Sequence, residues 1–268
     1  MLSVNRTAYR YTPVKLPDED EVRAEIIELA CNHGRAGYRQ VTDMMRNKGR
    51  LINHKRVERI WSEEGLKVPQ KQIKRSRLWL NDGSCARLRP THKNHVWSYD
   101  FMEDKTVNGK KIRFLNIIDE HERVCLASIP RRSWRNNDVI EVLANLMLVH
   151  GVPEYLRSDN GPEFTAKKVR QWLKRIGVIT TFIEPGSPWE NGYCESYNAR
   201  MRDEFLNGEI FGNMYEAEVL TKRWVQYYNT VRPHSSLGGK PPAPQSIIPT
   251  SSQIIVHFSQ PTASFHSQ

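Results

Sequence analysis

Apolar positions in the first quarter of the chain recur at the three- and four-residue spacing of amphipathic helices. Three short helices are predicted, over about residues 18–34, 37–49 and 53–65. Acidic residues suit the start of the first helix, and Asn53 is a good N-cap for the third. Together they form a small all-α module at 21–66 that resembles a helix-turn-helix, although an ordinary three-helix bundle would give the same pattern.

From His95 onward the pattern changes to the alternation of strands. The predicted strands span 95–102, 114–118, 124–129, 155–158 and 178–183, and the predicted helices span 136–150, 165–176 and 191–206. The dipeptide Asn108-Gly109 is a strong hairpin signal between the first two strands. Three antiparallel strands followed by alternating helices and strands predict an α/β fold, with a mixed sheet flanked by helices.

These patterns divide the chain into consecutive parts. An N-terminal segment at 1–20 precedes the helical module, and a basic linker at 67–94 leads into a central body at 95–245. The tail at 246–268 is rich in Ser, Thr and Gln, and we expect it to be disordered or to form a short added strand.

The positive charge is concentrated before the central body. The net charge is +10, and counting Lys, Arg, Asp and Glu places +9 of it in residues 1–94 and +1 in the remainder. This imbalance favours a polyanionic partner such as DNA, the alternative being a solvated basic surface without a partner. The candidate DNA contacts are Lys55, Arg56 and Arg59 on the third helix, and Lys71, Lys74, Arg75 and Arg77 in the linker.

Several classes of protein are disfavoured. The sequence has no run of 18 apolar residues and no apolar signal segment near Met1. Its four cysteines are scattered and form no Cys-x-x-Cys pair. We therefore expect a cytoplasmic protein without disulfides and without a structural zinc site.

Three acidic residues carry the candidate chemistry. Asp100 lies among aromatic and apolar residues of a predicted strand, where a carboxylate is costly unless it is paired or binds metal. Asp159 follows a strand and precedes a turn, so an Asx-turn is its alternative role. Glu195 lies inside a helix, and 35 residues separate it from Asp159. Three carboxylates on three elements can hold two divalent cations for phosphodiester chemistry.

Neighbouring residues refine this choice. Glu190 stands at the irregular start of the same helix, where it can simply complement the helix dipole. Arg202 lies two turns beyond Glu195 on one face and is suited to grip a phosphate. Trp189 and Tyr193 suit either base stacking or core packing.

The ordered motifs resemble the OrfB-type transposases of insertion-sequence family three. This family belongs to the retroviral-integrase superfamily and has a ribonuclease-H-like fold. The matching motifs are Trp97-Ser98-Tyr99-Asp100, Ser158-Asp159-Asn160-Gly161-Pro162-Glu163-Phe164, Pro185-Gly186-Ser187-Pro188-Trp189-Glu190-Asn191-Gly192, Glu195-Ser196 and Tyr228-Asn229-Thr230-Val231-Arg232-Pro233-His234. The resemblance covers about residues 1–245 and gives His234 no chemical role.

The resemblance implies a DNA strand-cleaving and strand-joining enzyme. Asp100, Asp159 and Glu195 would bind two Mg²⁺ ions, with Mn²⁺ as a substitute, and Arg202 would be the associated basic residue. The implied partners are insertion-sequence ends, target DNA, other copies of the chain and an upstream OrfA segment joined by frameshifting. No leucine heptads occur here, so a zipper would come from OrfA. The alternatives are a non-catalytic DNA-binding regulator and a stand-alone ribonuclease H.

Overall fold

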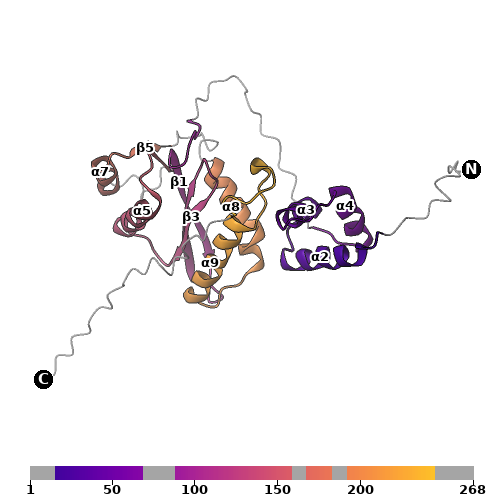
Figure 1. Ribbon diagram of the computed structural model, residues 1–268. Helices are drawn as coiled ribbons and strands as arrows, with labels where there is room; N and C mark the ends of the chain where they lie inside the picture. Colours follow the sequence, from indigo (N-terminus) through magenta and orange to yellow (C-terminus); the bar gives the residue numbers. More distant parts are fainter. Residues whose placement is uncertain (1–15, 69–87, 159–166, 183–191, 245–268) are drawn as a thin grey trace, which may run out of the picture. The chain divides into compact units, whose positions relative to one another are not determined.

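The computed structural model describes residues 16–68, 88–158, 167–182 and 192–244 (Figure 1). The chain divides into two compact units, Met1–Lys74 and Arg75–Gln268. In the parts that are described, no helix combines the length and apolar character needed to cross a bilayer.

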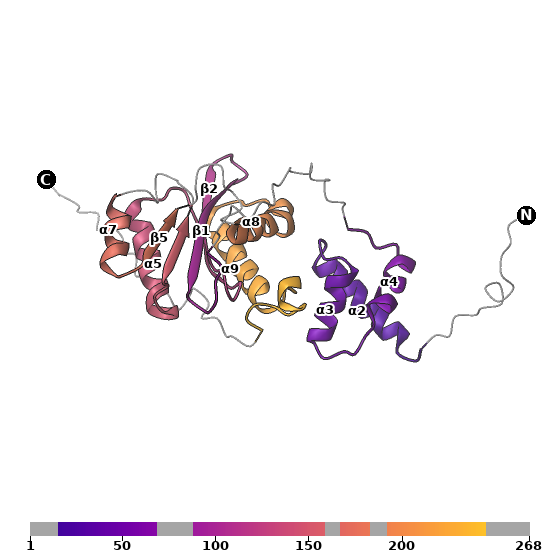
Figure 2. The same cartoon turned by 90° about the horizontal axis from the view of Figure 1, so that it is seen from above.

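The first unit contains the three expected helices, α2 (Glu19–Asn32), α3 (Tyr38–Asn47) and α4 (His54–Glu63) (Figure 2). The Asn53 side chain caps α4 by accepting a hydrogen bond of 3.0 Å from the Lys55 backbone. The apolar face of each helix is buried in one shared core, which includes Val22, Ile26, Val41, Met45, Val57 and Ile60. The prediction of a small all-α module is therefore confirmed.

The second unit is built on a five-stranded mixed sheet with the order β3-β2-β1-β4-β5. Its strands are β1 (Val96–Lys105), β2 (Lys111–Asp119), β3 (Cys125–Arg131), β4 (Tyr155–Ser158) and β5 (Ile179–Phe182). The first three strands are antiparallel, whereas β4 and β5 run parallel to β1. The β1–β2 hairpin turns at Gly109, whose φ of 73° lies in the left-handed region. The predicted mixed sheet is confirmed.

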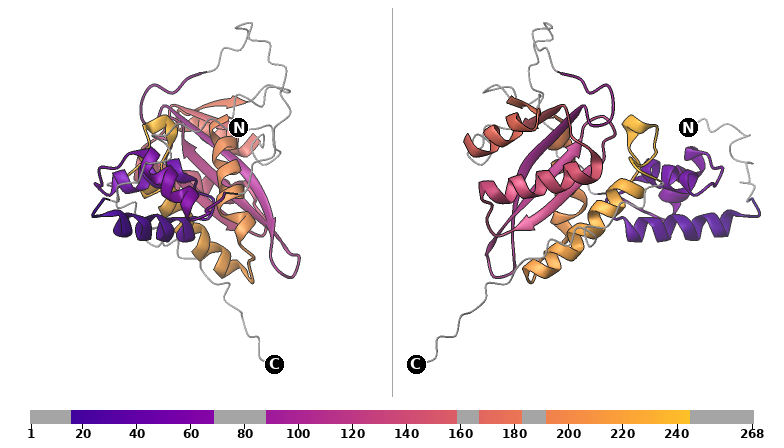
Figure 3. Two further views of the ribbon diagram at one scale, coloured as in Figure 1. Left: turned by 90° about the vertical axis from the view of Figure 1, so that its right-hand side faces the viewer. Right: turned by 60° about the vertical axis from the view of Figure 1, so that its left-hand side comes forward.

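Helices cover both faces of this sheet (Figure 3). They are α5 (Asn136–His150), α7 (Lys167–Arg175), α8 (Gly192–Glu204) and α9 (Met214–Thr230), with short 3-10 helices η2 (Leu206–Gly208) and η3 (Ser235–Leu237). One core lies between the sheet and α5 with α7, and the other lies between the sheet and α8 with α9. The sequence pattern does not predict α9.

The alternation of β1 assigns its side chains to these two cores. Trp97 and Tyr99 pack in the core beneath α5 and α7, whereas Met102 packs in the core beneath α8 and α9. Because successive side chains of a strand point to opposite faces, Asp100 belongs to the α8 side. This placement directs the Asp100 carboxylate toward the helix that carries Glu195.

Candidate active site

The Asp100 carboxylate is half-buried on β1 and is held by two hydrogen bonds. Its Oδ1 accepts from the Phe101 backbone N–H at 2.7 Å, and its Oδ2 accepts from Asn198 Nδ2 at 2.7 Å. These hydrogen bonds fix the orientation of the Asp100 carboxylate on β1.

Helix α8 brings Glu195 to the same face of the sheet. The buried Cys194, Tyr197 and Met201 anchor α8 in the core, while Glu195 is exposed. Burial, followed by the nearby Asp100 charge and with a smaller contribution from Glu195, raises the pKa of the Cys194 thiol well above its usual range. Asn198, three residues after Glu195 on α8, donates to Asp100 Oδ2, so the structure brings the helix that carries Glu195 against the strand that carries Asp100.

The third predicted carboxylate, Asp159, lies outside the described residues. Ser158, which precedes it in sequence, ends β4 and is buried. Among the residues that the structure describes, no three His, Cys, Asp or Glu side chains gather as a metal-binding group. The structure therefore describes two of the three predicted ligands, and the metal-binding role of all three stays a prediction.

Arg202 lies on the same side of α8 as Asn198 and reaches the other half of β1. Its Nη1 donates to Asp104 Oδ2 at 2.8 Å, and its Nη2 donates to the Glu103 carbonyl. The guanidinium side chain is 39% exposed, so a phosphate could compete for it. Asn198 is the residue that sequence reasoning missed, although it stands three positions after Glu195 and therefore on a neighbouring part of the helix face.

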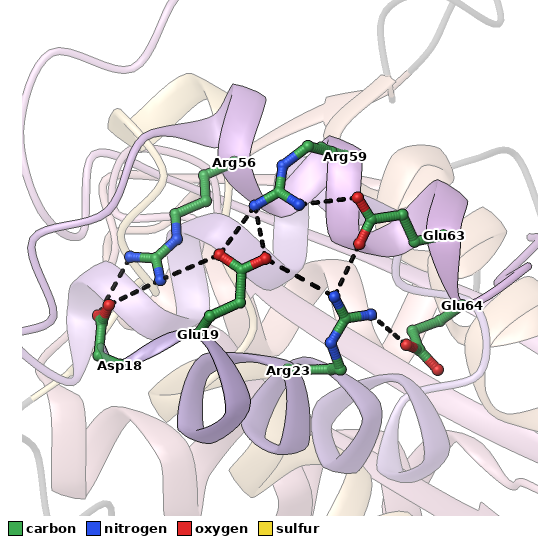
Figure 4. A network of polar contacts seen from close by, with 7 residues as sticks. All are labelled: Asp18, Glu19, Arg23, Arg56, Arg59, Glu63 and Glu64. Atoms are coloured by element: carbon green, nitrogen blue, oxygen red, sulfur yellow. Dashed lines mark hydrogen bonds and ion pairs between the residues drawn. The ribbon is translucent and has the colours of Figure 1, made fainter. Parts of the chain in front are cut away.

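In the helical module, the predicted DNA-contacting arginines have carboxylate partners. Arg56 donates to Asp18, and Arg59 donates to both oxygens of Glu19 at 2.8 and 2.9 Å and to Glu63 at 2.7 Å (Figure 4). Glu19 is only 3% exposed, so its charge depends on these partners. The two arginines thus hold α2 against α4.

The other predicted DNA contacts lie on α4 and in the linker. Lys55 is exposed on α4. Lys71, Lys74, Arg75 and Arg77 lie outside the described residues. None of these DNA contacts is tested by the structure, so all of them stay predictions.

His234 is buried in the second unit beneath the Tyr228 ring, with the two ring centres 4.7 Å apart. Burial, together with the neighbouring Arg232 charge, lowers the pKa of His234 to about 4. The imidazole is therefore neutral near pH 7 and has a packing role in this unit.

This burial predicts a pH-dependent stability. The unfolded imidazole has a pKa of about 6.5, so between pH 6.5 and 4 the unfolded chain binds more protons than the folded chain. The His234 contribution is complete above pH 6.5 and declines as the pH falls, by up to about 3 kcal/mol. Urea unfolding of the His234→Gln variant should show a smaller decline over this range. The exposed His121→Gln variant is the control and should behave as the parent chain does; an unchanged decline in His234→Gln would contradict the assignment.

Comparisons with known proteins agree with this architecture. Two family models described as "Integrase core domain" match residues 90–188 and 176–242, and one described as "HTH-like domain" matches residues 17–74. Among solved structures, the HTLV-2 integrase catalytic core overlaps with a TM-score of 0.44 at 16% identity, covering 56% of this chain and 94% of that chain.

Relatives in insertion elements are more similar. A protein of insertion element IS476 from Xanthomonas euvesicatoria is 33% identical over 243 residues, 91% of this chain and 69% of the relative. A protein of IS407 from Burkholderia multivorans is 31% identical and covers 88% of this chain and 84% of the relative. The putative transposase InsK of IS150 from Escherichia coli is 27% identical and covers 87% and 86%. The chain belongs to the insertion-sequence transposases of the OrfB type in family three, with a helix-turn-helix-like module followed by an integrase core.

Proposed function

We propose that this transposase is the catalytic subunit that cuts DNA at insertion-sequence ends and transfers the resulting strand to a target. Asp100, Asp159 and Glu195 would be the metal ligands. The observation that carries this proposal is the 2.7 Å hydrogen bond from Asn198 to Asp100. It joins β1 to the helix that also carries Glu195, so two carboxylates from distant parts of the chain share one face of the sheet.

The register of the parallel strands supports Asp159 as the third ligand. In the β1–β4 pairing, Val96 lies beside Tyr155 and Ser98 lies beside Arg157. Asp159 follows Arg157 by two residues, just as Asp100 follows Ser98. The sequence thus places Asp159 directly after β4, the strand that pairs in parallel with the strand that carries Asp100.

The donor set suits Mg²⁺. All three proposed ligands are carboxylates, and hard divalent cations prefer oxygen ligands. Two such ions, when bound, supply activation of a water or a 3′-hydroxyl and stabilise the departing oxygen. The protein's own part is to hold Asp100 in one orientation, to present Glu195 from α8, and to offer the Arg202 guanidinium to a phosphate in place of Asp104.

Strand cleavage on DNA that carries the ends of its own element tests this proposal. The chain should nick that DNA with Mg²⁺ or Mn²⁺ and should be inactive in a metal chelator. DNA binding without metal-dependent nicking would instead identify a non-catalytic regulator. Hydrolysis restricted to RNA–DNA hybrids would identify a ribonuclease H.

The helical module would supply DNA contact through the exposed Lys55. Lys55→Gln is expected to lower the slope of log affinity against log salt concentration by about 1, because one phosphate contact is lost. Its melting temperature should stay unchanged, whereas Arg56→Gln and Arg59→Gln should also loosen the module by releasing Glu19. Fluorescence anisotropy across a salt series measures the slope. Lys222→Gln, an exposed change on α9, is the control, and an equal effect in both variants would contradict a specific role for Lys55.

Partners of the whole transposase are also part of the proposal. Two chemical steps at two element ends call for more than one catalytic unit, so we propose assembly of several copies on DNA. An OrfA segment, fused or associated, would add recognition of the ends. Comparing cleavage by this chain with and without the upstream frame tests this point.

A further inference from the structure

A row of hydrogen-bonded polar side chains crosses the α8-facing side of the sheet and ends at Asp100. Ser128 Oγ on β3 donates to Asn116 Oδ1 on β2 at 2.6 Å. Asn116 Nδ2 donates to Asn198 Oδ1 on α8 at 2.7 Å, and Asn198 Nδ2 donates to Asp100 Oδ2 at 2.7 Å. Four elements are therefore linked by three consecutive hydrogen bonds.

This row has one consistent direction. An ionised carboxylate can only accept, so the Asn198 amide must turn its nitrogen to Asp100 and its oxygen to Asn116. Asn116 in turn must present its nitrogen to Asn198 and its oxygen to Ser128. A reversed Asn198 amide would place oxygen against oxygen at one end and nitrogen against nitrogen at the other. The Asp100 carboxylate therefore sets the direction of the whole row, and the Ser128 hydroxyl, which can donate or accept, completes it at the far end.

The surroundings of the row are apolar. Asn116 is fully buried and Ser128 is 8% exposed, within the core that contains Cys194, Tyr197 and Met201. Polar groups in such a core are costly unless every member is satisfied, and apolar side chains would fill the same layer without that cost. A connected row that leads to one half-buried carboxylate therefore points to a task at that carboxylate.

We propose that Asn198 is a positioning residue that sets the orientation of Asp100 and its separation from Glu195. Because Asn198 lies one helical turn after Glu195, its bond to Asp100 fixes the β1 carboxylate relative to the helix that presents the other one. Asn116, which is bound by Ser128 on β3, donates to Asn198 Oδ1 and so supports the orientation in which the Asn198 nitrogen faces Asp100. This inference rests on the proposed function, in which Asp100 and Glu195 bind the metal.

The test measures metal binding as well as activity. Titration of the full chain with Mn²⁺, followed by electron paramagnetic resonance, should show roughly tenfold weaker binding in Asn198→Ala, the order of effect expected when a residue supporting a ligand is removed. The Mg²⁺ concentration for half-maximal cleavage should rise by a similar factor, and the rate should recover in part at high Mg²⁺. Ser128→Ala should shift both quantities in the same direction by a smaller factor. Asn207→Ala, which removes an exposed amide on η2, should leave both unchanged.

The outcomes separate this inference from the proposed function. A folded Asn198→Ala variant with the parent's Mn²⁺ affinity and Mg²⁺ dependence would overturn the positioning role. If Asn198→Ala does not fold, Asn198→Ser, whose shorter side chain cannot reproduce the amide's two hydrogen bonds, takes its place, and parent-like Mn²⁺ binding in it would overturn the inference. Asp100→Asn is measured in parallel: retained metal binding and cleavage in that variant would overturn the proposed function itself, whereas their loss beside a parent-like Asn198→Ala would overturn the positioning role alone.

Discussion

Asp100→Asn and Glu195→Gln are each expected to reduce metal-dependent strand cleavage and strand transfer by roughly 10³-fold or more, the order seen when one member of a catalytic unit is removed. An amide of the same shape has no negative charge and only one oxygen, so it is a poor ligand for a hard cation. In Asp100→Asn the new amide would also meet the Asn198 amide, which now donates at 2.7 Å. Asp159→Asn is expected to have the same effect.

The controls separate chemistry from folding and from DNA binding. Each variant should bind end-bearing DNA within about twofold of the parent, because phosphate contacts supply most of the affinity. Glu209→Gln makes the same chemical change at an exposed position of the same unit and should cleave normally. A variant of Asp100 or Glu195 that cleaves at the parent rate with Mg²⁺ would remove that residue from the proposed site.

The sequence was sufficient for most elements because their signals are local. The helix α5 begins and ends at the residues predicted, since Gly151 stops a clear run of apolar positions. The α9 helix was missed although Asn213 caps it by accepting from the Glu216 backbone at 2.9 Å. That capping signal was present in the sequence, and so was the helical spacing of the buried Ala217, Trp224 and Tyr228.

The details of the site depend on contacts between distant residues. Asn198 shares a helix with Glu195, but its partner Asp100 is 98 positions away, and no local pattern connects them. The same holds for Arg59, whose charge was predicted to face DNA. Its carboxylate partner Glu19 lies 40 positions earlier, so only the packing of α2 on α4 brings the two together.

The second large effect is expected in the stability of the second unit, Arg75–Gln268. Arg157 on β4 donates from Nη1 to both oxygens of Glu120 at 2.6 and 2.7 Å, and from Nη2 to the Leu88 carbonyl. The two side chains are 4% and 0% exposed. Glu120 follows β2, and its backbone N–H donates to the carbonyl of Val96, the first residue of β1. The ion pair therefore ties β4 to the β2–β1 edge just before Asp159.

Arg157→Met is expected to lower the free energy of unfolding by about 3–5 kcal/mol, because it removes the guanidinium that faces both oxygens of the buried Glu120 carboxylate. Lys111→Met provides the contrast: Lys111 and Glu103 are 2.6 Å apart, but their side chains are 53% and 50% exposed, so this change should cost no more than about 1 kcal/mol. Urea unfolding measures the free energy of unfolding of both variants, and hydrogen exchange at the β1 and β4 amides reports on the strands that the ion pair joins.

The double variant Arg157→Met with Glu120→Leu distinguishes the cause of this loss. If the cost arises from the guanidinium lost beside a buried charge, removing that charge as well should restore much of the stability, because replacing both members of a buried ion pair by apolar residues costs far less than removing one member. Cleavage should recover less than stability, because Arg157 also binds the Leu88 carbonyl and stands two residues before Asp159. Equal costs for Arg157→Met and Lys111→Met, or a double variant as unstable as the two single losses together, would contradict this account of how β4 is held in place.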